Sequence, residues 1–256
     1  MYFESHAHYD DSAFDTDRQE ILNLLPAFGV EFVVNSASDM PSSRAGIALA
    51  EKYDYIYAAI GVHPHEVKNM KEEDLEMLAS LSKHQKVVAI GEIGLDYYYD
   101  YSPRDAQKYW FEKQLALALM LDMPVIIHSR DAAQETFDII KESGVKKGVI
   151  HCYSGSLEMA KEYVKLGFHI GIGGVLTYKN ANTLLTVVKE IPFERILIET
   201  DSPYLSPVPN RGKRNDSRNL LYITQKLAEV KNVTHIEAAN ITLKNAKLLF
   251  FHKIVA

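Results

Sequence analysis

The sequence predicts an α/β fold, namely a single-domain (β/α)8 TIM barrel over residues 1–256. The length suits one barrel, and short apolar runs alternate with longer amphipathic stretches. Several runs, such as VVAIG and VIIH, are almost continuously apolar, which is typical of parallel strands covered on both faces. We expect strands at Met1–His6, Val30–Ser36, Tyr55–Val62, Lys86–Gly91, Pro124–His128, Gly148–His151, His169–Gly173 and Ile196–Glu199.

An open doubly wound sheet is the competing architecture, but no glycine-rich nucleotide fingerprint follows the first run. Pro26 interrupts the helical stretch Asp17–Phe28, so we expect that helix to kink or end early. The segment Ser202–Asn219 should form a long loop after the eighth strand. Two helices, over Leu220–Val230 and Thr234–Phe251, should then close the chain.

Composition restricts the functions that fit the chain. A net charge of −6 argues against broad electrostatic attraction to nucleic acid or anionic membranes, so a nucleic-acid substrate would need a local basic feature and metal. The single cysteine excludes an intramolecular disulfide. We find neither a secretory signal nor a run of eighteen apolar residues, and we expect a cytoplasmic protein with no membrane association and no obligate protein partner.

Histidines and carboxylates gather at the carboxyl ends of the predicted strands, where the active site of such a barrel lies. Six of the ten histidines fall there, together with two acids: His6, His8, His63, His65, Glu92, His128, His151 and Asp201. In a strand, residues i and i+2 share a face, so both members of the first His-x-His pair can point into the barrel mouth.

Imidazoles with carboxylates suit Zn²⁺, Mn²⁺ or Fe²⁺, whereas an all-oxygen set would favour Mg²⁺ or Ca²⁺. A lone His-x-His pair or a lone acid would more often be a hydrogen-bonded core group. Here several strands place such groups at one end of the barrel, and this favours metal binding. Burying so many ionisable groups together without metal would carry a large desolvation free energy. Four imidazoles and two carboxylates exceed the needs of one tetrahedral ion, so a pair of ions bridged by Glu92 fits better.

Two further residues have structural interpretations. Cys152 follows His151, and strand alternation would turn it toward the helices as a buried structural thiol. His169 opens the seventh strand and should lie at the opposite end of the barrel, where it would be structural.

The most basic segment is the loop after the eighth strand, which carries Arg211, Lys213, Arg214 and Arg218. It is either a solvated loop or a clamp on phosphate, for which the planar guanidinium is suited. Arg130, close to His128, could serve the same purpose. The run Tyr97-Tyr98-Tyr99 after Glu92 could stack on bases or simply pack the loops, and the sequence does not decide between them.

The ordered segments ESHAHYD, GVHPHE, AIGEIGLDYY, PVIIHSRDA, HCYSGS, IGIGG and ETDSPYLSPVPNRGKRN resemble the motifs of the TatD-type deoxyribonucleases, in the metal-dependent amidohydrolase superfamily. The match runs from residue 4 to about residue 215. One departure is Ala7, where many members carry cysteine. The resemblance implies that the divalent-metal ligands are His6, His8, Glu92, His128, His151 and Asp201.

It also implies that His63 and His65 match the family's GxHPH motif near the substrate. Many binuclear relatives in the superfamily use a carboxylated lysine at the end of the fourth strand, and Glu92 takes that place here.

These observations together predict a metal-dependent hydrolase of phosphodiester bonds in DNA, with two divalent ions (Mg, Mn or Zn) activating water. Glu92 and Asp201 would be catalytic, with Asp201 orienting the water and accepting its proton. The phosphate would be held by His63, His65, Arg130, Arg211 and Lys213. The alternatives are hydrolysis of a carboxylic ester, lactone, amide or aminoacyl bond, and a non-catalytic metal-binding scaffold. The scaffold would be expected to show a broken ligand set, which this sequence does not.

Overall fold

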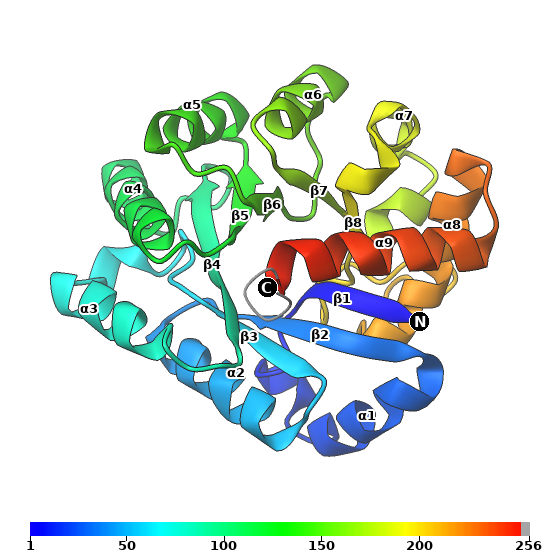
Figure 1. The fold of residues 1–256 in the computed structure, drawn as a ribbon, viewed down its shortest axis with the longest axis horizontal. Helices are drawn as coiled ribbons and strands as arrows, with labels where there is room; N and C mark the ends of the chain where they lie inside the picture. Colours follow the sequence, from blue (N-terminus) through cyan, green and yellow to red (C-terminus); the bar gives the residue numbers. More distant parts are fainter. Residues whose placement is uncertain (252–256) are drawn as a thin grey trace.

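A computed structural model describes residues 1–251 as a barrel of parallel strands ringed by helices (Figure 1). The strands pair in chain order, and they are β1 (Tyr2–Ala7), β2 (Val30–Ser36), β3 (Ile56–Ile60), β4 (Val87–Asp96), β5 (Val125–Arg130), β6 (Gly148–Ile150), β7 (His169–Ile172) and β8 (Ile196–Ile198). The α-helices are α1 (Arg18–Leu24), α2 (Met40–Lys52), α3 (Glu72–Leu81), α4 (Arg104–Met120), α5 (Ala133–Ser143), α6 (Leu157–Lys165), α7 (Asn182–Glu190), α8 (Leu220–Lys231) and α9 (His235–Phe250).

The predicted TIM barrel is therefore confirmed, although residues 252–256 of the predicted domain lie outside the described part. Within residues 1–251, no helix is long and apolar enough to cross a bilayer.

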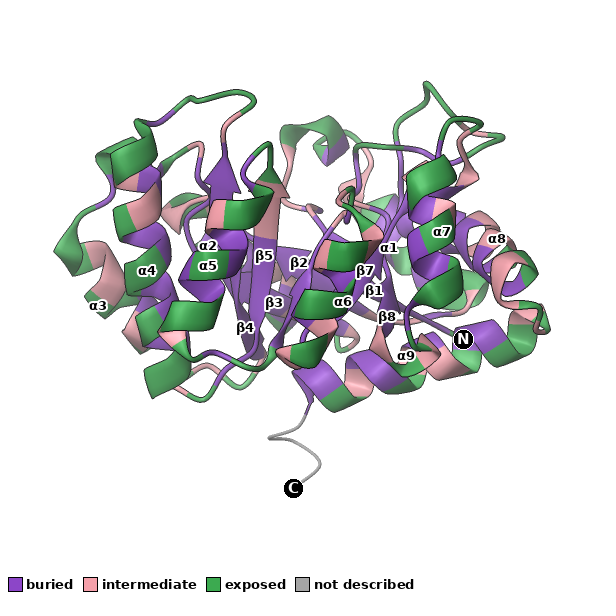
Figure 2. Cartoon of the chain, turned by 90° about the horizontal axis from the view of Figure 1, so that it is seen from above, coloured by how far each residue is buried: buried purple, intermediate pink, exposed green. Residues whose placement is uncertain are grey.

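The core has two parts, which alternate along the strands. Most buried apolar side chains lie between the strands and the outer helices, whose far faces are exposed (Figure 2). A smaller cluster includes Phe3, Val34 and Ile126 from the strands with Leu249 and Phe250 from α9. Figure 2 shows α9 running beneath the strands, at the end opposite their arrowheads. One end of the barrel is thus plugged by α9, which leaves the carboxyl ends of the strands for function.

The barrel closes between β1 and β8 through a seam with little regular pairing. Among residues 1–251, the backbone bonds that join them lie past the end of β8, where the amide of Asp201 donates to His6 (3.0 Å) and that of His8 donates to Ser202 (2.8 Å). These two bonds place His6, His8 and Asp201 side by side. The seam therefore builds one half of the predicted metal site.

Deeper in the seam, the fully buried Glu4 carboxyl replaces a backbone partner. Its Oε1 accepts from the amides of Thr200 (2.8 Å) and His6 (3.3 Å). Its Oε2 lies 2.6 Å from the Thr200 hydroxyl and 2.8 Å from that of Ser217. Burial is the main reason that the pKa of Glu4 rises to about 8, so the group is largely a neutral acid at pH 7. Glu4 thus links β1, the end of β8 and the loop beyond it.

One strand boundary was predicted wrongly. We expected the fourth strand to end at Gly91, but β4 continues to Asp96 and pairs Gly94 with His128 and Asp96 with Arg130 in β5. Past an irregularity between Ile90 and Ile93, the pairing with β5 resumes at Ile93 and continues to Asp96.

The other strand boundaries differ from the predicted ones by two residues at most. The helix containing Pro26 does end early: α1 stops at Leu24 and a 3-10 turn follows over Leu25–Phe28. The two closing helices, α8 and α9, lie where they were expected.

Candidate metal centre

A cleft of about 450 Å³ opens at the carboxyl ends of the strands. Its lining contains His8, His63, His65, Glu92, Asp96, Tyr99, His128, Arg130, His151, Asp201, Tyr204 and Leu205, together with Ser38 and Glu66. Of the six predicted metal ligands, only His6 does not line the cleft, because it is fully buried against His8 and Glu92. The fold therefore brings the whole predicted ligand set together.

The first half of the site comes from the β1–β8 seam. His6 Nε2 and His8 Nε2 lie 3.0 Å apart, and Asp201 Oδ1 lies 3.6 Å and 3.5 Å from them. Glu92 Oε2 is 3.3 Å from His6 Nε2 and 3.6 Å from His8 Nε2. Four donor atoms thus converge on one point.

The second half gathers around the other oxygen of Glu92. Oε1 lies 2.7 Å from His151 Nε2, 2.9 Å from His128 Nδ1 and 3.5 Å from His63 Nε2. The rings of His6 and His151 stack at 4.0 Å, so the two halves are adjacent. His63 was predicted to contact substrate, and the structure places it within the ligand group of Glu92 and His128.

The spacing of these atoms fits bound metal. Metal–nitrogen bonds of about 2.0–2.1 Å put neighbouring ligands of a tetrahedral ion about 3.4 Å apart. The donor pairs above span 2.7–3.6 Å, and each half combines imidazoles with one oxygen of Glu92. Glu92 thus contributes one carboxylate oxygen to each half of the site.

The surrounding histidines lower the pKa values of the two acids in the site, Glu92 and Asp201. Burial alone would raise the pKa of Glu92, but the surrounding His151, His63 and His6 hold it well below its ordinary value. Burial likewise opposes ionisation of Asp201, but His8, His151 and His6 together outweigh it, so its pKa is lowered. Both acids are therefore carboxylates at neutral pH, the form that binds a cation.

Partners behind the imidazoles fix their orientation. His8 Nδ1 lies 2.8 Å from the Ser36 carbonyl, and the Ser36 hydroxyl lies 3.1 Å from His6 Nδ1. Behind His151, Glu199 Oε1 is 3.6 Å from Nδ1, beyond hydrogen-bond distance. The contacts at the outer nitrogens of His6 and His8 orient these two rings and leave their inner nitrogens for a metal.

Asp96 is a site residue that the sequence analysis missed. It is fully buried at the end of β4, and its Oδ2 lies 2.9 Å from His65 Nε2 and 3.0 Å from His128 Nε2. Its Oδ1 accepts from the amides of Tyr98 and Tyr99. A predicted fourth strand that ran to Asp96 would have placed this residue on the same face as Glu92, because the two are four residues apart.

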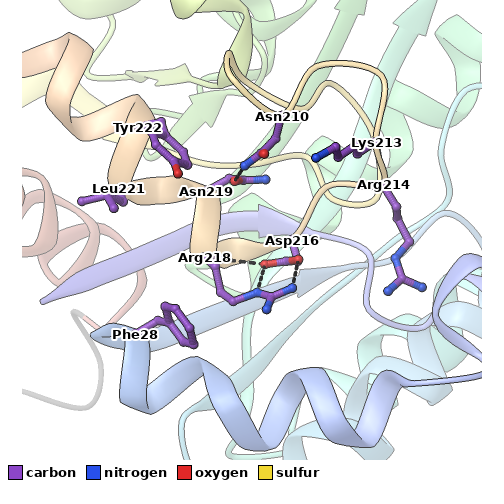
Figure 3. Close-up of a pocket in the computed structure, with 9 residues that line it drawn as sticks. All are labelled: Phe28, Asn210, Lys213, Arg214, Asp216, Arg218, Asn219, Leu221 and Tyr222. Carbon is purple, nitrogen blue, oxygen red and sulfur yellow. Dashed lines mark hydrogen bonds and ion pairs between the residues drawn. The ribbon is translucent and has the colours of Figure 1, made fainter.

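The predicted phosphate-binding cations separate into two places. Arg130 lines the cleft, but Arg211 and Lys213 do not. The Arg211 guanidinium lies over the Tyr178 ring at 4.4 Å. Lys213 lines a second pocket of about 360 Å³ beside Tyr222, which is drawn in Figure 3. The substrate roles of Arg211 and Lys213 remain predictions.

The other two cations of that loop are already paired. Arg214 binds Asp17 through both guanidinium nitrogens, and Arg218 forms a bidentate pair with Asp216 (Figure 3). The Arg214 pair joins the loop to the segment before α1, whereas the Arg218 pair lies within the loop itself.

Cys152 and His169 were both assigned structural roles. The prediction for Cys152 needs correction: the residue is half-buried, because β6 ends at Ile150 and the chain turns with a φ of 44° at Cys152, so strand alternation does not apply. Burial raises the pKa of its thiol well above the ordinary value, which disfavours a nucleophilic thiolate. His169 does begin β7, at the end away from the cleft, and is buried.

A parallel barrel that joins two histidine–carboxylate groups at the carboxyl ends of its strands has the site of a metal-dependent hydrolase. A family model described as TatD related DNase matches residues 3–251. The chain belongs to the TatD family.

Relatives support the same assignment along the whole chain. An uncharacterized metal-dependent hydrolase, YabD of Bacillus subtilis (strain 168), is 47% identical over 252 residues, which cover 98% of this chain and 99% of YabD. A second, YcfH of Escherichia coli (strain K12), is 34% identical, with 96% and 94% of the two chains covered. The crystal structure of YjjV, a TatD homologue from Escherichia coli K12, superimposes with a TM-score of 0.92 at 32% identity, covering 97% of each chain.

Proposed function

We propose that this hydrolase cleaves phosphodiester bonds in DNA and uses two divalent ions, with Mg²⁺, Mn²⁺ and Zn²⁺ as the candidates. The observation that carries the proposal is the position of Glu92, whose two oxygens each belong to a separate group of imidazoles. When bound, such ions activate water and neutralise charge on a phosphoryl group.

The chain's own residues have distinct roles in this reaction. The residues that would hold the ions are His6, His8, Glu92, His128, His151 and Asp201, with His63 beside them. Asp201 lines the cleft and is a carboxylate at neutral pH, so it is suited to orient the attacking water and accept its proton. Arg130 stands at the same cleft and supplies a cation for the phosphate.

Phosphate is favoured over a carboxylic ester, lactone, amide or aminoacyl substrate because of Arg130. Its guanidinium has no ion-pair partner within residues 1–251, so its charge is available to an anion entering the cleft. The donor groups themselves do not discriminate, since activated water attacks carbonyl and phosphoryl centres alike.

The test is hydrolysis of 3′-labelled and 5′-labelled single-stranded DNA by metal-stripped protein, with Mg²⁺, Mn²⁺ or Zn²⁺ restored separately. Glu92→Ala and Asp201→Ala should lower kcat on the order of a thousandfold or more, because interactions worth several kcal/mol are removed. Glu112→Ala, an exposed glutamate on α4, is the matched control and should behave like the wild type.

Full activity in both site variants would refute their assignment. Intact DNA with every ion, from protein shown by elemental analysis to hold metal, would refute the nuclease proposal. The same samples should then be assayed against carboxylic esters and lactones.

A further inference from the structure

Beside the cleft, the loop after β4 exposes three tyrosine rings, which we call the tyrosine patch: Tyr98, Tyr99 and Tyr101. Their exposed fractions are 59%, 43% and 57%, although the preceding Tyr97 packs against the core. Aromatic side chains left exposed together mark a surface for binding more often than a requirement of folding. The sequence alone does not show that Tyr97 is packed while the tyrosines after it are exposed.

The rings of the patch are ordered against one another. Tyr99 and Tyr101 stack at a centroid distance of 5.2 Å and an angle of 24°, and Tyr98 meets Tyr99 edge to face at 4.9 Å. His65 contacts both Tyr99 and Tyr101 with its ring, at 5.4 Å and 4.8 Å. The patch is therefore continuous with a histidine that lines the cleft.

A cation lies over this patch. The Arg130 guanidinium is 4.1 Å from the Tyr98 ring centroid and 4.7 Å from that of Tyr99. Arg130 and Tyr99 both line the cleft. A group bound there would meet an aromatic surface and a positive charge at once.

The patch is also tied rigidly to the metal centre. Asp96 Oδ1 accepts from the amide of Tyr98 at 3.0 Å and from that of Tyr99 at 2.8 Å. Its other oxygen lies 3.0 Å from His128 Nε2, and His128 Nδ1 lies 2.9 Å from Glu92. One buried carboxyl therefore holds both the tyrosine turn and a predicted metal ligand.

We propose that the tyrosine patch is a nucleobase subsite, on which the base next to the scissile phosphate stacks while Arg130 contacts that phosphate. This inference rests on the proposed phosphodiester hydrolysis. Every base has a π-face, so the subsite accepts any sequence, but the base must be free of its helix stack. The preferred substrate is therefore a single strand or a frayed end.

The direct test measures binding, which does not require cleavage. The probes are a fluorescein-labelled thymidine oligonucleotide and the same strand with tetrahydrofuran abasic residues, titrated with metal-free protein at fixed salt and followed by anisotropy. The wild type should bind the thymidine strand about tenfold more tightly, which corresponds to about 1.4 kcal/mol.

Tyr99→Ala should remove that difference, and Tyr99→Phe should retain it, because the ring and not the hydroxyl does the stacking. The matched control is Tyr109→Ala, a tyrosine on α4 with a similar exposed fraction of 44%, which should bind like the wild type.

Equal binding of the two strands by the wild type would overturn the subsite, as would a Tyr99→Ala protein that keeps the full preference. Cleavage is read separately after ions are restored. A base preference without cleavage would keep the subsite and reject the nuclease, whereas cleavage without a base preference would do the reverse.

Discussion

Substitution of Glu4 tests whether its carboxyl holds the β1–β8 seam together. Glu4→Ala would leave the buried amides of Thr200 and His6 without the oxygen that accepts from them. Each unsatisfied buried donor costs about 1–3 kcal/mol, and water entering the small cavity recovers a part, so we expect a loss of about 3–5 kcal/mol in the free energy of unfolding.

Glu4→Gln should behave differently because the amide suits the same partners. Its carbonyl oxygen can accept from the two backbone amides, and its NH₂ can donate to the hydroxyls of Thr200 and Ser217, which now face Oε2. We therefore expect Glu4→Gln to lie within about 1 kcal/mol of the wild type at pH 7.

The two variants should also differ from the wild type in pH dependence. The pKa of Glu4 is raised by burial from 4.5 to about 8, so the folded chain keeps a proton that the unfolded chain loses. Its contribution to stability is complete below about pH 4.5 and is lost as the pH rises through 8. From pH 5 to pH 8 the wild type should lose stability relative to Glu4→Gln.

The assay is urea unfolding followed by far-ultraviolet circular dichroism, in EDTA so that metal binding does not add to the apparent stability. The reasoning is refuted if Glu4→Ala costs less than about 1 kcal/mol, or if Glu4→Gln is as unstable as Glu4→Ala.

Three other perturbations have defined outcomes. Burial and nearby Arg195 lower the pKa of His169 to about 4, so its contribution to stability is present above about pH 6.5 and is lost as the pH falls toward 4. In metal-free urea titrations, the free energy of unfolding should fall between pH 7 and pH 5 by roughly 2 kcal/mol less in His169→Gln than in the wild type. An equal fall in both proteins would contradict this. Gly94→Ala adds a methyl group that clashes with the His128 carbonyl at a φ of +145°, so metal content and melting temperature should both fall sharply, and a variant with normal metal content would disprove the close approach. Arg214→Ala removes a partly exposed ion pair with Asp17 and should cost less than about 1 kcal/mol in urea unfolding, with DNA hydrolysis unchanged. A large loss of activity would instead indicate that the loop Ser202–Asn219 contacts the substrate.

Part of this protein is determined locally and can be predicted from the sequence. Runs such as VVAIG and VIIH are apolar on both faces, and this alone predicts parallel strands and a barrel. The positions of His6, His8, His128, His151 and Asp201 relative to the ends of these runs predict where their side chains gather. Both inferences depend on residue type and spacing along the chain.

The remaining features depend on partners far away in the sequence. β4 extends to Asp96 through its pairing with β5. At this position Asp96 contacts both His128 and the backbone of the tyrosine patch. Glu4 becomes a neutral structural acid because the folded barrel buries its carboxyl fully, although the hydrogen bonds from Thr200 and Ser217 act in the opposite direction on its pKa. Arg130 lines the cleft because it is the last residue of β5, whereas Lys213 lies in the loop after β8 and lines the other pocket. Local composition determined which groups this protein carries to the ends of its strands, and only long-range packing decided which of them meet.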